Sequence, residues 1–194
     1  MKQFLFIACL FIVQSGFAQD YNVVLGNKEM NDGNYRLAQD YYQAALAQEP
    51  QNWNLYTLLG FCYHKQKLYK DADSLFRIAV KNDSTSSKAF WYKGLNHLTL
   101  RQDSMAIVNF KKFISLEKTR GGSLIQAYRY IGQSYERILK KDGLYSWQID
   151  DMLFHYEQIE RTDPSYVEVP QIRNFIDLVK SKRPANQSGK WKLE

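Results

Sequence analysis

The chain repeats itself with a fixed period of about 34 residues, and this self-similarity limits the fold more than any other feature of the sequence. Glycine, alanine and aromatic residues each recur at that interval in three columns: Gly26, Gly60 and Gly94; Ala38, Ala72 and Ala106; Tyr42, Phe76 and Phe110. A fixed period of roughly 20–50 residues is typical of stacked repeats, in which each unit buries its apolar face against its neighbours.

Residues that break helices are scarce. The 194 residues include 10 glycines and 4 prolines, and no proline occurs between residues 51 and 163. Hydrophobic residues make up 45% of the chain and charged residues 24%, as in an ordinary globular protein. These features exclude the collagen-like, disulfide-rich and multi-span membrane classes, and they predict helices rather than short strands.

The pattern resembles the tetratricopeptide repeat, a unit of this length made of two antiparallel helices. The resemblance covers residues 19–52, 53–86 and 87–120, and a fourth copy at 125–166 carries about eight extra residues between or within its helices. It implies an all-α fold, a right-handed solenoid of about four helix pairs over residues 19–181. Apolar residues at helical spacing predict a capping helix over 166–181, and the basic segment 182–194 is expected to be a flexible tail.

The repeated columns predict how the helices pack. Glycine and alanine mark places where paired helices approach within about 8–10 Å, and the aromatic column is expected to fill the gap toward the next repeat. Turns are predicted between the two helices of a copy at 31–34, 65–67 and 101–103, and between copies at 82–86 and 118–122.

Residues 1–18 are expected to be a cleaved secretory signal peptide. Lys2 precedes an apolar run of ten residues, 4–13, and small residues stand three and one positions before a cut ahead of Gln19. Ten residues are too few for a bilayer span, which needs roughly 20. Lipidation at Cys9 is the less favoured rival. Cleavage would remove Lys2, lowering the net charge from +6 to +5, and the protein is expected in a bacterial periplasm, at the cell surface or secreted, with no integral membrane span.

The sequence offers no constellation for catalysis. His64, His97 and His155 fall in different repeats without partners at metal-ligand spacing, and His97 is expected in the core. After signal cleavage Cys62 is left without a disulfide partner, so a buried apolar role is expected. Nucleophile elbows, phosphate-binding loops and zinc-type cysteine clusters are absent from the sequence. We therefore expect no enzyme activity, no cofactor and no metal.

The resemblance implies a concave groove lined by the first helix of each pair. Its positions hold Asn27 in the first copy; Asn54, Thr57, Phe61, His64 and Lys65 in the second; Lys88, Trp91, Leu95 and Leu98 in the third; and Gln126, Arg129, Gln133 and Glu136 in the fourth. Family members that grip a C-terminal carboxylate use five positions that here hold Val23, Asn27, Leu58, Lys88 and Tyr92; two of the five match, which disfavours that clamp. Phe61 and Trp91 suit an apolar anchor for a bound peptide, with packing between repeats as the alternative of equal weight.

These features predict a non-catalytic scaffold or adaptor of the bacterial cell envelope, binding a peptide or protein segment in the groove. The alternative is an accessory domain that binds an envelope glycan or an anionic lipid through its positive charge. Nucleic acid is not an expected partner, because the basic residues are scattered. Leu144, Tyr145 and Trp147, in an insertion at Lys140–Trp147, are expected to cover the core of the fourth repeat rather than protrude toward a partner.

Overall fold

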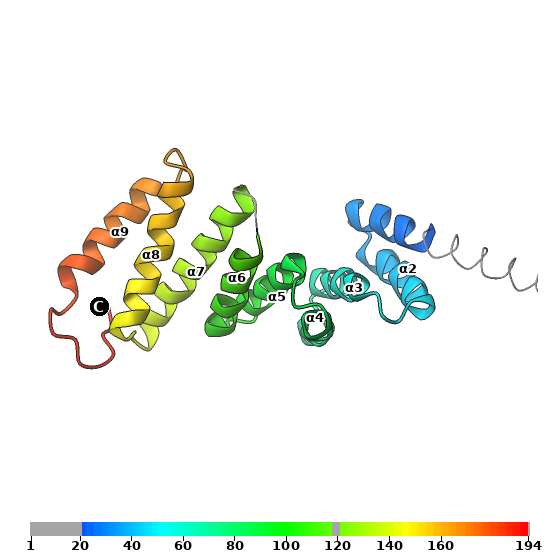
Figure 1. Cartoon of the computed structure of the whole chain (residues 1–194), viewed down its shortest axis with the longest axis horizontal. Helices are drawn as coiled ribbons and strands as arrows, with labels where there is room; N and C mark the ends of the chain where they lie inside the picture. The colour runs from blue at the N-terminus through cyan, green and yellow to red at the C-terminus, as the bar shows by residue number, and fades with distance from the viewer. Residues whose placement is uncertain (1–20, 118–120, 194) are drawn as a thin grey trace, which may run out of the picture. The chain divides into compact units, whose positions relative to one another are not determined.

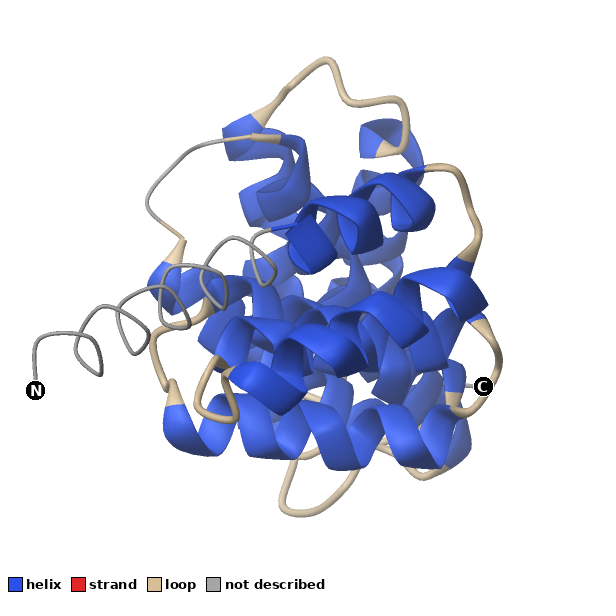
Figure 2. Cartoon of the chain, turned by 90° about the vertical axis from the view of Figure 1, so that its right-hand side faces the viewer, coloured by secondary structure: helices blue, strands red, loops and turns tan. Residues whose placement is uncertain are grey.

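The computed structural model describes residues 21–117 and 121–193, whose regular structure is α-helical apart from one isolated β-bridge (Figure 2). The expected signal peptide and the residues 118–120 of one predicted turn lie outside the described part. The chain divides into two compact units, Met1–Tyr92 and Lys93–Glu194. None of the helices in the described ranges is long and apolar enough to cross a membrane.

Helices of the first unit pair in sequence order. A helix over residues 21–31 precedes α2 (Tyr35–Gln48), α3 (Trp53–Lys65) packs against α4 (Tyr69–Asn82), and α5 (Ser87–Thr99) begins within this unit (Figure 1). The helices of each pair are separated at the predicted turns, and both alanines of the repeat are fully buried in α2, as Ala38 and Ala45. The periodic columns therefore predicted both the helix ends and the packed faces.

The turn inside each of the first three helix pairs contains a residue with left-handed backbone, again at the interval of the repeat. The φ angles are 82° at Gly33, 65° at Lys67 and 58° at Arg101. The residue after each donates its N–H to a carbonyl five residues earlier, as from Leu68 to Tyr63 at 2.9 Å, which closes the helix in the manner of a Schellman motif. Glycine adopts this conformation without strain, whereas for a residue with a Cβ it costs about 1–2 kcal/mol.

The second unit includes two helices that are longer than those of the first unit. It contains α6 (Asp103–Leu116), α7 (Gly122–Lys141), α8 (Ser146–Thr162) and α9 (Val169–Lys182), of which α7, α8 and α9 lie side by side (Figure 1). α7 has 20 residues and α8 has 17, against 13 in α3 and 14 in α4. Most of the extra residues of the fourth copy therefore lengthen its helices.

The aromatic column packs against the glycine column of the same helix pair. A Cβ added to Gly60 would lie 2.7 Å from Cε1 of Phe76, and the distances are 2.6 Å for Gly26 with Tyr42, 2.9 Å for Gly94 with Phe110 and 2.5 Å for Gly132 with Tyr156. The absence of a side chain on glycine is what lets each ring lie so close to the facing helix backbone.

These rings also reach the next helix along the chain, as expected. Ring centroids lie 6.5 Å apart for Phe76 and Tyr92, 5.2 Å for Phe110 and Tyr130, and 5.7 Å for Tyr156 and Phe175. The expectation that the aromatic column fills the gap between repeats is confirmed, and the contact with the repeat's own glycine adds to it.

In α9 the apolar positions at helical spacing are the buried ones. Val169, Ile172, Ile176 and Val179 are buried, while Arg173 pairs with Glu160 of α8 on the outside. This confirms the predicted apolar stripe, with the helix beginning at Val169.

The segment after α9, expected to be flexible, packs against the turn between α7 and α8. Leu144 and Trp191 exchange two backbone hydrogen bonds of 2.9 Å each, and the Gln187 side-chain amide donates to the Leu144 carbonyl at 2.7 Å. Leu144 and Leu193 are both buried. The basic composition of residues 182–194 predicted a flexible tail. Composition does not reveal the contact, because it is made by backbone N–H and C=O groups, which nearly every residue carries.

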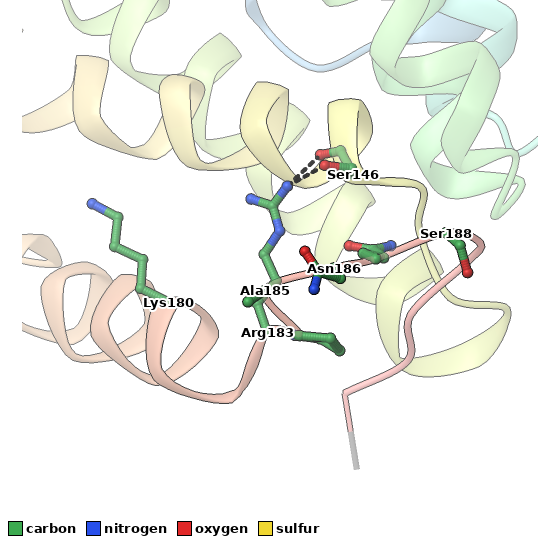
Figure 3. A pocket seen from close by; sticks show the side chains of 8 residues that line it. Ser146, Lys180, Arg183, Ala185, Asn186 and Ser188 are labelled. Carbon is green, nitrogen blue, oxygen red and sulfur yellow. Dashed lines mark hydrogen bonds between the residues drawn. The ribbon is translucent and has the colours of Figure 1, made fainter.

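Arg183 fixes the start of this segment. Its guanidinium donates to the hydroxyl of Ser146, the first residue of α8 (Figure 3). The guanidinium also pairs with Asp150 of the same helix. A surface pocket of about 590 Å³ lies beside it, lined by Lys180, the residues 183–188 and Ser146. Because Arg183 is already paired inside the chain, this pocket holds little unsatisfied charge.

The insertion differs from expectation in two of its three apolar residues. Leu144 is buried, but Tyr145 is 47% exposed and Trp147 is 64% exposed. The buried residues of α8 include Ile149 and Met152, and helical spacing places Trp147 on a different face from these. The expectation that all three residues cover the core is therefore wrong for Tyr145 and Trp147.

Candidate functional site

A cluster of three aromatic rings and one lysine forms in the first unit. Phe61 of α3 lies between Tyr35 of α2 and Tyr92 of α5, with ring centroids 6.0 Å and 4.6 Å away. The Nζ atom of Lys65 lies 5.3 Å from the centroid of Phe61 and 5.7 Å from that of Tyr35. We refer to Tyr35, Phe61, Lys65 and Tyr92 as the aromatic–lysine cluster.

Helix geometry explains why these side chains meet. Phe61 and Lys65 are four residues apart on α3, so they share one face of that helix. Tyr35 is the first residue of α2, which places its ring beside the end of α3. A lysine over an aromatic face gains about 0.5–1 kcal/mol at an exposed site, so the rings orient the Lys65 side chain.

The cluster leaves both apolar and charged surface open. Phe61 is half-buried and Lys65 is exposed. Within the described part of the chain, Lys65 forms no ion pair with a carboxylate; its neighbours are the two rings. Phe61 thus packs between helices and retains accessible surface; its use as an anchor for a bound peptide stays a prediction.

Other predicted groove residues of the first unit are differently placed. Thr57 is 1% exposed, so it cannot contact a partner; it lies on the same face of α3 as Phe61, one helical turn earlier. Asn54 is exposed near the start of α3, beside Trp53 in a separate pocket. Asn27 is half-buried and accepts a hydrogen bond of 2.8 Å from the Tyr42 hydroxyl.

Three further predicted residues lie near the cluster in sequence. His64 packs its ring against Tyr69, with centroids 5.3 Å apart. Trp91 is half-buried in α5, next to Tyr92 of the cluster. Lys88 also belongs to α5, and desolvation by its surroundings lowers the pKa of its ammonium group.

The predicted groove residues of the fourth copy are engaged inside the second unit. Nε of Arg129 lies 2.9 Å from Glu168, just before α9. Glu136 accepts a hydrogen bond of 3.0 Å from the Tyr156 hydroxyl and pairs with Lys140 at 2.6 Å. Arg129 and Glu136, which the resemblance placed in a groove facing a partner, are therefore paired with opposite charges inside the unit.

The remaining predicted residues of this unit offer little free surface. Gln126 donates to the Tyr166 hydroxyl at 3.3 Å, and Leu95 and Leu98 are partly buried. Gln133 lines a pocket of about 440 Å³ together with Phe175 and the two paired glutamates.

Sequence reasoning overlooked two members of the cluster. Tyr35 lies on the second helix of its pair, outside the positions assigned to the groove, although Tyr69 holds the equivalent place in the next copy. Tyr92 occupies one of the positions that do not match the carboxylate clamp. Tyr35 is the first residue of α2 and Tyr92 lies in the middle of α5, so they share aromatic character but no common place in the repeat that could have found them.

The cysteine and two of the histidines in the described part of the chain, Cys62, His97 and His155, are buried. Cys62 is buried, as expected, and desolvation raises its thiol pKa to about 12, which keeps it protonated and unreactive. His97 is also buried, as expected. Across residues 21–117 and 121–193, no group of three His, Cys, Asp or Glu side chains is placed to hold a metal ion.

Comparisons with known proteins agree with this architecture. Residues 30–91 match the family model described as tetratricopeptide repeat. The DnaJ homolog subfamily C member 7 of Mus musculus is 32% identical over 99 residues, which are 49% of this chain and 20% of that protein, and the Homo sapiens counterpart gives the same values. The chain thus spans about a fifth of the length of these relatives.

Solved structures with the same fold include MamA, with 21% identity and a TM-score of 0.69 over 86% of this chain and 84% of that one. YrrB, described as having an unusual peptide-binding site, gives 16% identity and a TM-score of 0.66 over 84% and 77%. The first tetratricopeptide-repeat domain of RPAP3, solved with a bound HSP90 peptide, has 22% sequence identity and a TM-score of 0.57. The match covers 62% of this chain and 92% of that domain. These likenesses confirm an all-α fold of the helical-repeat solenoid class. With its periodic glycine and aromatic columns and its paired helices, the chain has the fold of the tetratricopeptide repeat, and residues 30–91 match the model of that family.

Proposed function

We propose that this protein is a non-catalytic scaffold that binds a peptide or protein segment at the aromatic–lysine cluster. The single observation that carries the proposal is the position of Lys65, an exposed cation held over Phe61 and Tyr35 without a carboxylate partner in the described part of the chain. Three of the four cluster residues are aromatic, and aromatic side chains dominate many protein interfaces.

The geometry indicates the chemistry of the partner. An apolar side chain would cover the accessible edge of Phe61, while a carboxylate or backbone carbonyl beside it would accept from Lys65. Such a pairing gives affinity through the apolar anchor and orientation through the charge. The likeness to domains solved with bound peptides supports this use of the fold.

The proposed setting is a bacterial cell envelope. The pattern of residues 1–18 supports export, and the lack of any disulfide partner for Cys62 in the expected mature chain is compatible with it. Intact-mass measurement of the protein recovered from its native cell checks this step: we expect a mature N-terminus at Gln19 or a neighbouring residue. Recovery of the full-length chain from the cytoplasm would overturn the export proposal.

Quantitative affinity capture from the envelope fraction tests the binding function. Bait proteins would be the wild type, Phe61→Ala, Lys65→Glu and a matched control, Lys70→Ala, which removes an exposed lysine of the same repeat. The proposal predicts one protein recovered with the wild type and with Lys70→Ala but depleted with both cluster variants. Equal recovery on all four baits would contradict it.

Salt dependence separates this proposal from binding of an anionic glycan or lipid by overall positive charge. Attraction that depends on several exposed charges weakens steeply as salt rises. Anchoring by Phe61 depends mainly on apolar contact, so recovery of the partner should change little between low and moderate salt. Loss of all recovery at moderate salt would favour the charge-driven alternative.

A further inference from the structure

A second surface pocket in the first unit has a chemistry unlike that of the aromatic–lysine cluster. It has a volume of about 660 Å³ and lies where α2 ends, α3 begins and α4 ends. Its lining combines one tryptophan and one proline with neutral amides and two carboxylates: Glu49, Pro50, Gln51, Asn52, Trp53, Asn54 and Asp83. The volume falls within the roughly 300–1,000 Å³ of small-molecule sites.

The apolar wall of the pocket is held in place by neighbouring groups. The Trp53 ring stacks on Tyr56, with centroids 5.7 Å apart and an interplanar angle of 29°. The Tyr56 hydroxyl in turn donates to the Pro50 carbonyl at 3.1 Å. Trp53 therefore offers an indole ring of fixed orientation, and such a ring presents a broad apolar face with a polar N–H at its edge.

Hydrogen-bonding groups surround this ring. Asn52 donates to one oxygen of Glu49 at 3.1 Å and accepts from the Leu55 N–H at 3.4 Å, so both side chains of the pair are oriented. Oδ1 of Asp83 accepts two hydrogen bonds from Thr85, at 3.0 and 2.7 Å. These bonds lower the pKa of Asp83, so it is an ionised hydrogen-bond acceptor at neutral pH.

The amides of Gln51 and Asn54 complete the lining. Both side chains are exposed, and each amide supplies two N–H donors and one acceptor oxygen. Within the described residues the lining contains no lysine or arginine, although the whole chain has a net charge of +6. The two carboxylates would therefore repel an anionic ligand.

We propose that this pocket, the Trp53 pocket, binds a neutral sugar of about disaccharide size. The C–H face of a pyranose ring packs on the Trp53 indole, and its hydroxyl groups, which donate and accept alike, bond to the carboxylates and amides. A quaternary ammonium group would need several aromatic walls, and a proline-rich peptide would need a groove of aromatic rings, whereas here one indole stands among five polar side chains.

Titration of the purified full chain with maltose, cellobiose and diacetylchitobiose tests this proposal, followed by calorimetry and by the indole N–H signals in NMR spectra. We expect saturable binding of at least one disaccharide, with a shift of the Trp53 signal. Trp53→Ala should weaken it at least about tenfold, as loss of a central aromatic contact does, and Asn54→Ala should weaken it by a smaller factor. Trp147→Ala, which removes an exposed tryptophan of the second unit, is the matched control and should leave it unchanged.

Lys65→Glu should also leave sugar binding unchanged, because the aromatic–lysine cluster is a separate site. Failure of the peptide-binding proposal would therefore not affect this one. No binding of any of the three disaccharides, binding that survives in folded Trp53→Ala, or binding of choline or polyproline in place of the sugars would each overturn it. Thermal unfolding of each variant checks that it is folded, and the exposed Asn54 provides a variant with little risk to the fold.

Discussion

The ring of Tyr156 lies so close to Gly132 that a Cβ there would come within 2.5 Å of the ring's Cε1 atom. The Tyr156 hydroxyl also donates to Glu136, one helical turn further along α7, at 3.0 Å. The glycine and its ring lie farther apart in sequence here than in the first three copies, where Gly26 and Tyr42 show the common spacing. The fourth copy therefore keeps the contact while its helices grow longer around it.

Replacing Gly60 with leucine should destabilise the first unit. The Cβ alone would lie 2.7 Å from the Phe76 ring, and overpacking of this kind costs typically about 1–3 kcal/mol. We expect a lower melting temperature with helical circular dichroism retained below it. Gly122→Ala is the control, since no atom lies within 4 Å of its added Cβ. An unchanged melting temperature for Gly60→Leu would mean that the helix crossing is not tight there.

Substitutions at the left-handed turn residues should change the free energy of unfolding in opposite directions: adding a side chain at Gly33 should lower it, and removing one at Lys67 should raise it. Gly33→Lys introduces a Cβ at a φ of 82° and should lower the free energy of unfolding by about 1–2 kcal/mol. Lys67→Gly relieves the same strain but adds chain entropy to the unfolded state, so a gain of at most about 1 kcal/mol is expected. Urea denaturation measures both. A stabilising Gly33→Lys would show that this turn is not left-handed in solution.

The repeat period predicted the helix pairs, and helical spacing predicted the apolar stripe of α9, because both follow from local sequence. Neither predicted the cluster, since the contacts of Phe61 with Tyr35 and Tyr92 depend on how three helices converge. The packing of Leu144 against Trp191 was also missed. That contact is made by backbone groups, which carry no residue-specific signal.

Removal of residues 184–194 should destabilise the second unit. The segment covers Leu144, which is fully buried, and burial of one leucine is worth about 1.5–3 kcal/mol. Thermal unfolding of the shortened chain should show a melting temperature lower by several degrees, while Lys190→Ala, which only removes a cation over Tyr145, should change it little. Equal stability of the shortened and complete chains would mean that the segment does not pack in solution.

The pH dependence of stability should depend on His155. Burial lowers the pKa of this imidazole; Asp151 opposes the shift and Lys111 of α6 adds to it, while Tyr128 of α7 stacks near its ring. In the unfolded chain His155 takes up a proton at about pH 6.5, whereas in the folded chain it takes up that proton only at a lower pH. Stability should therefore be fully present above that pH and be lost as pH falls through the lower folded pKa.

Melting temperatures of the wild type and His155→Gln, measured from neutral pH to about pH 5, check this prediction. The wild type should lose stability more steeply on acidification than the variant does. Identical slopes would show that the protonation of His155 is not linked to folding.

The most direct test of the central claim is the affinity of the captured partner for wild-type protein, Phe61→Ala, Lys65→Glu and Lys70→Ala, with melting temperatures measured on the same samples. If the aromatic–lysine cluster holds the partner, Phe61→Ala should cost about 2 kcal/mol of binding free energy or more. Lys65→Glu should slow association and alter its salt dependence, and Lys70→Ala should bind as the wild type does. Unchanged affinity in folded Phe61→Ala and Lys65→Glu would contradict the claim.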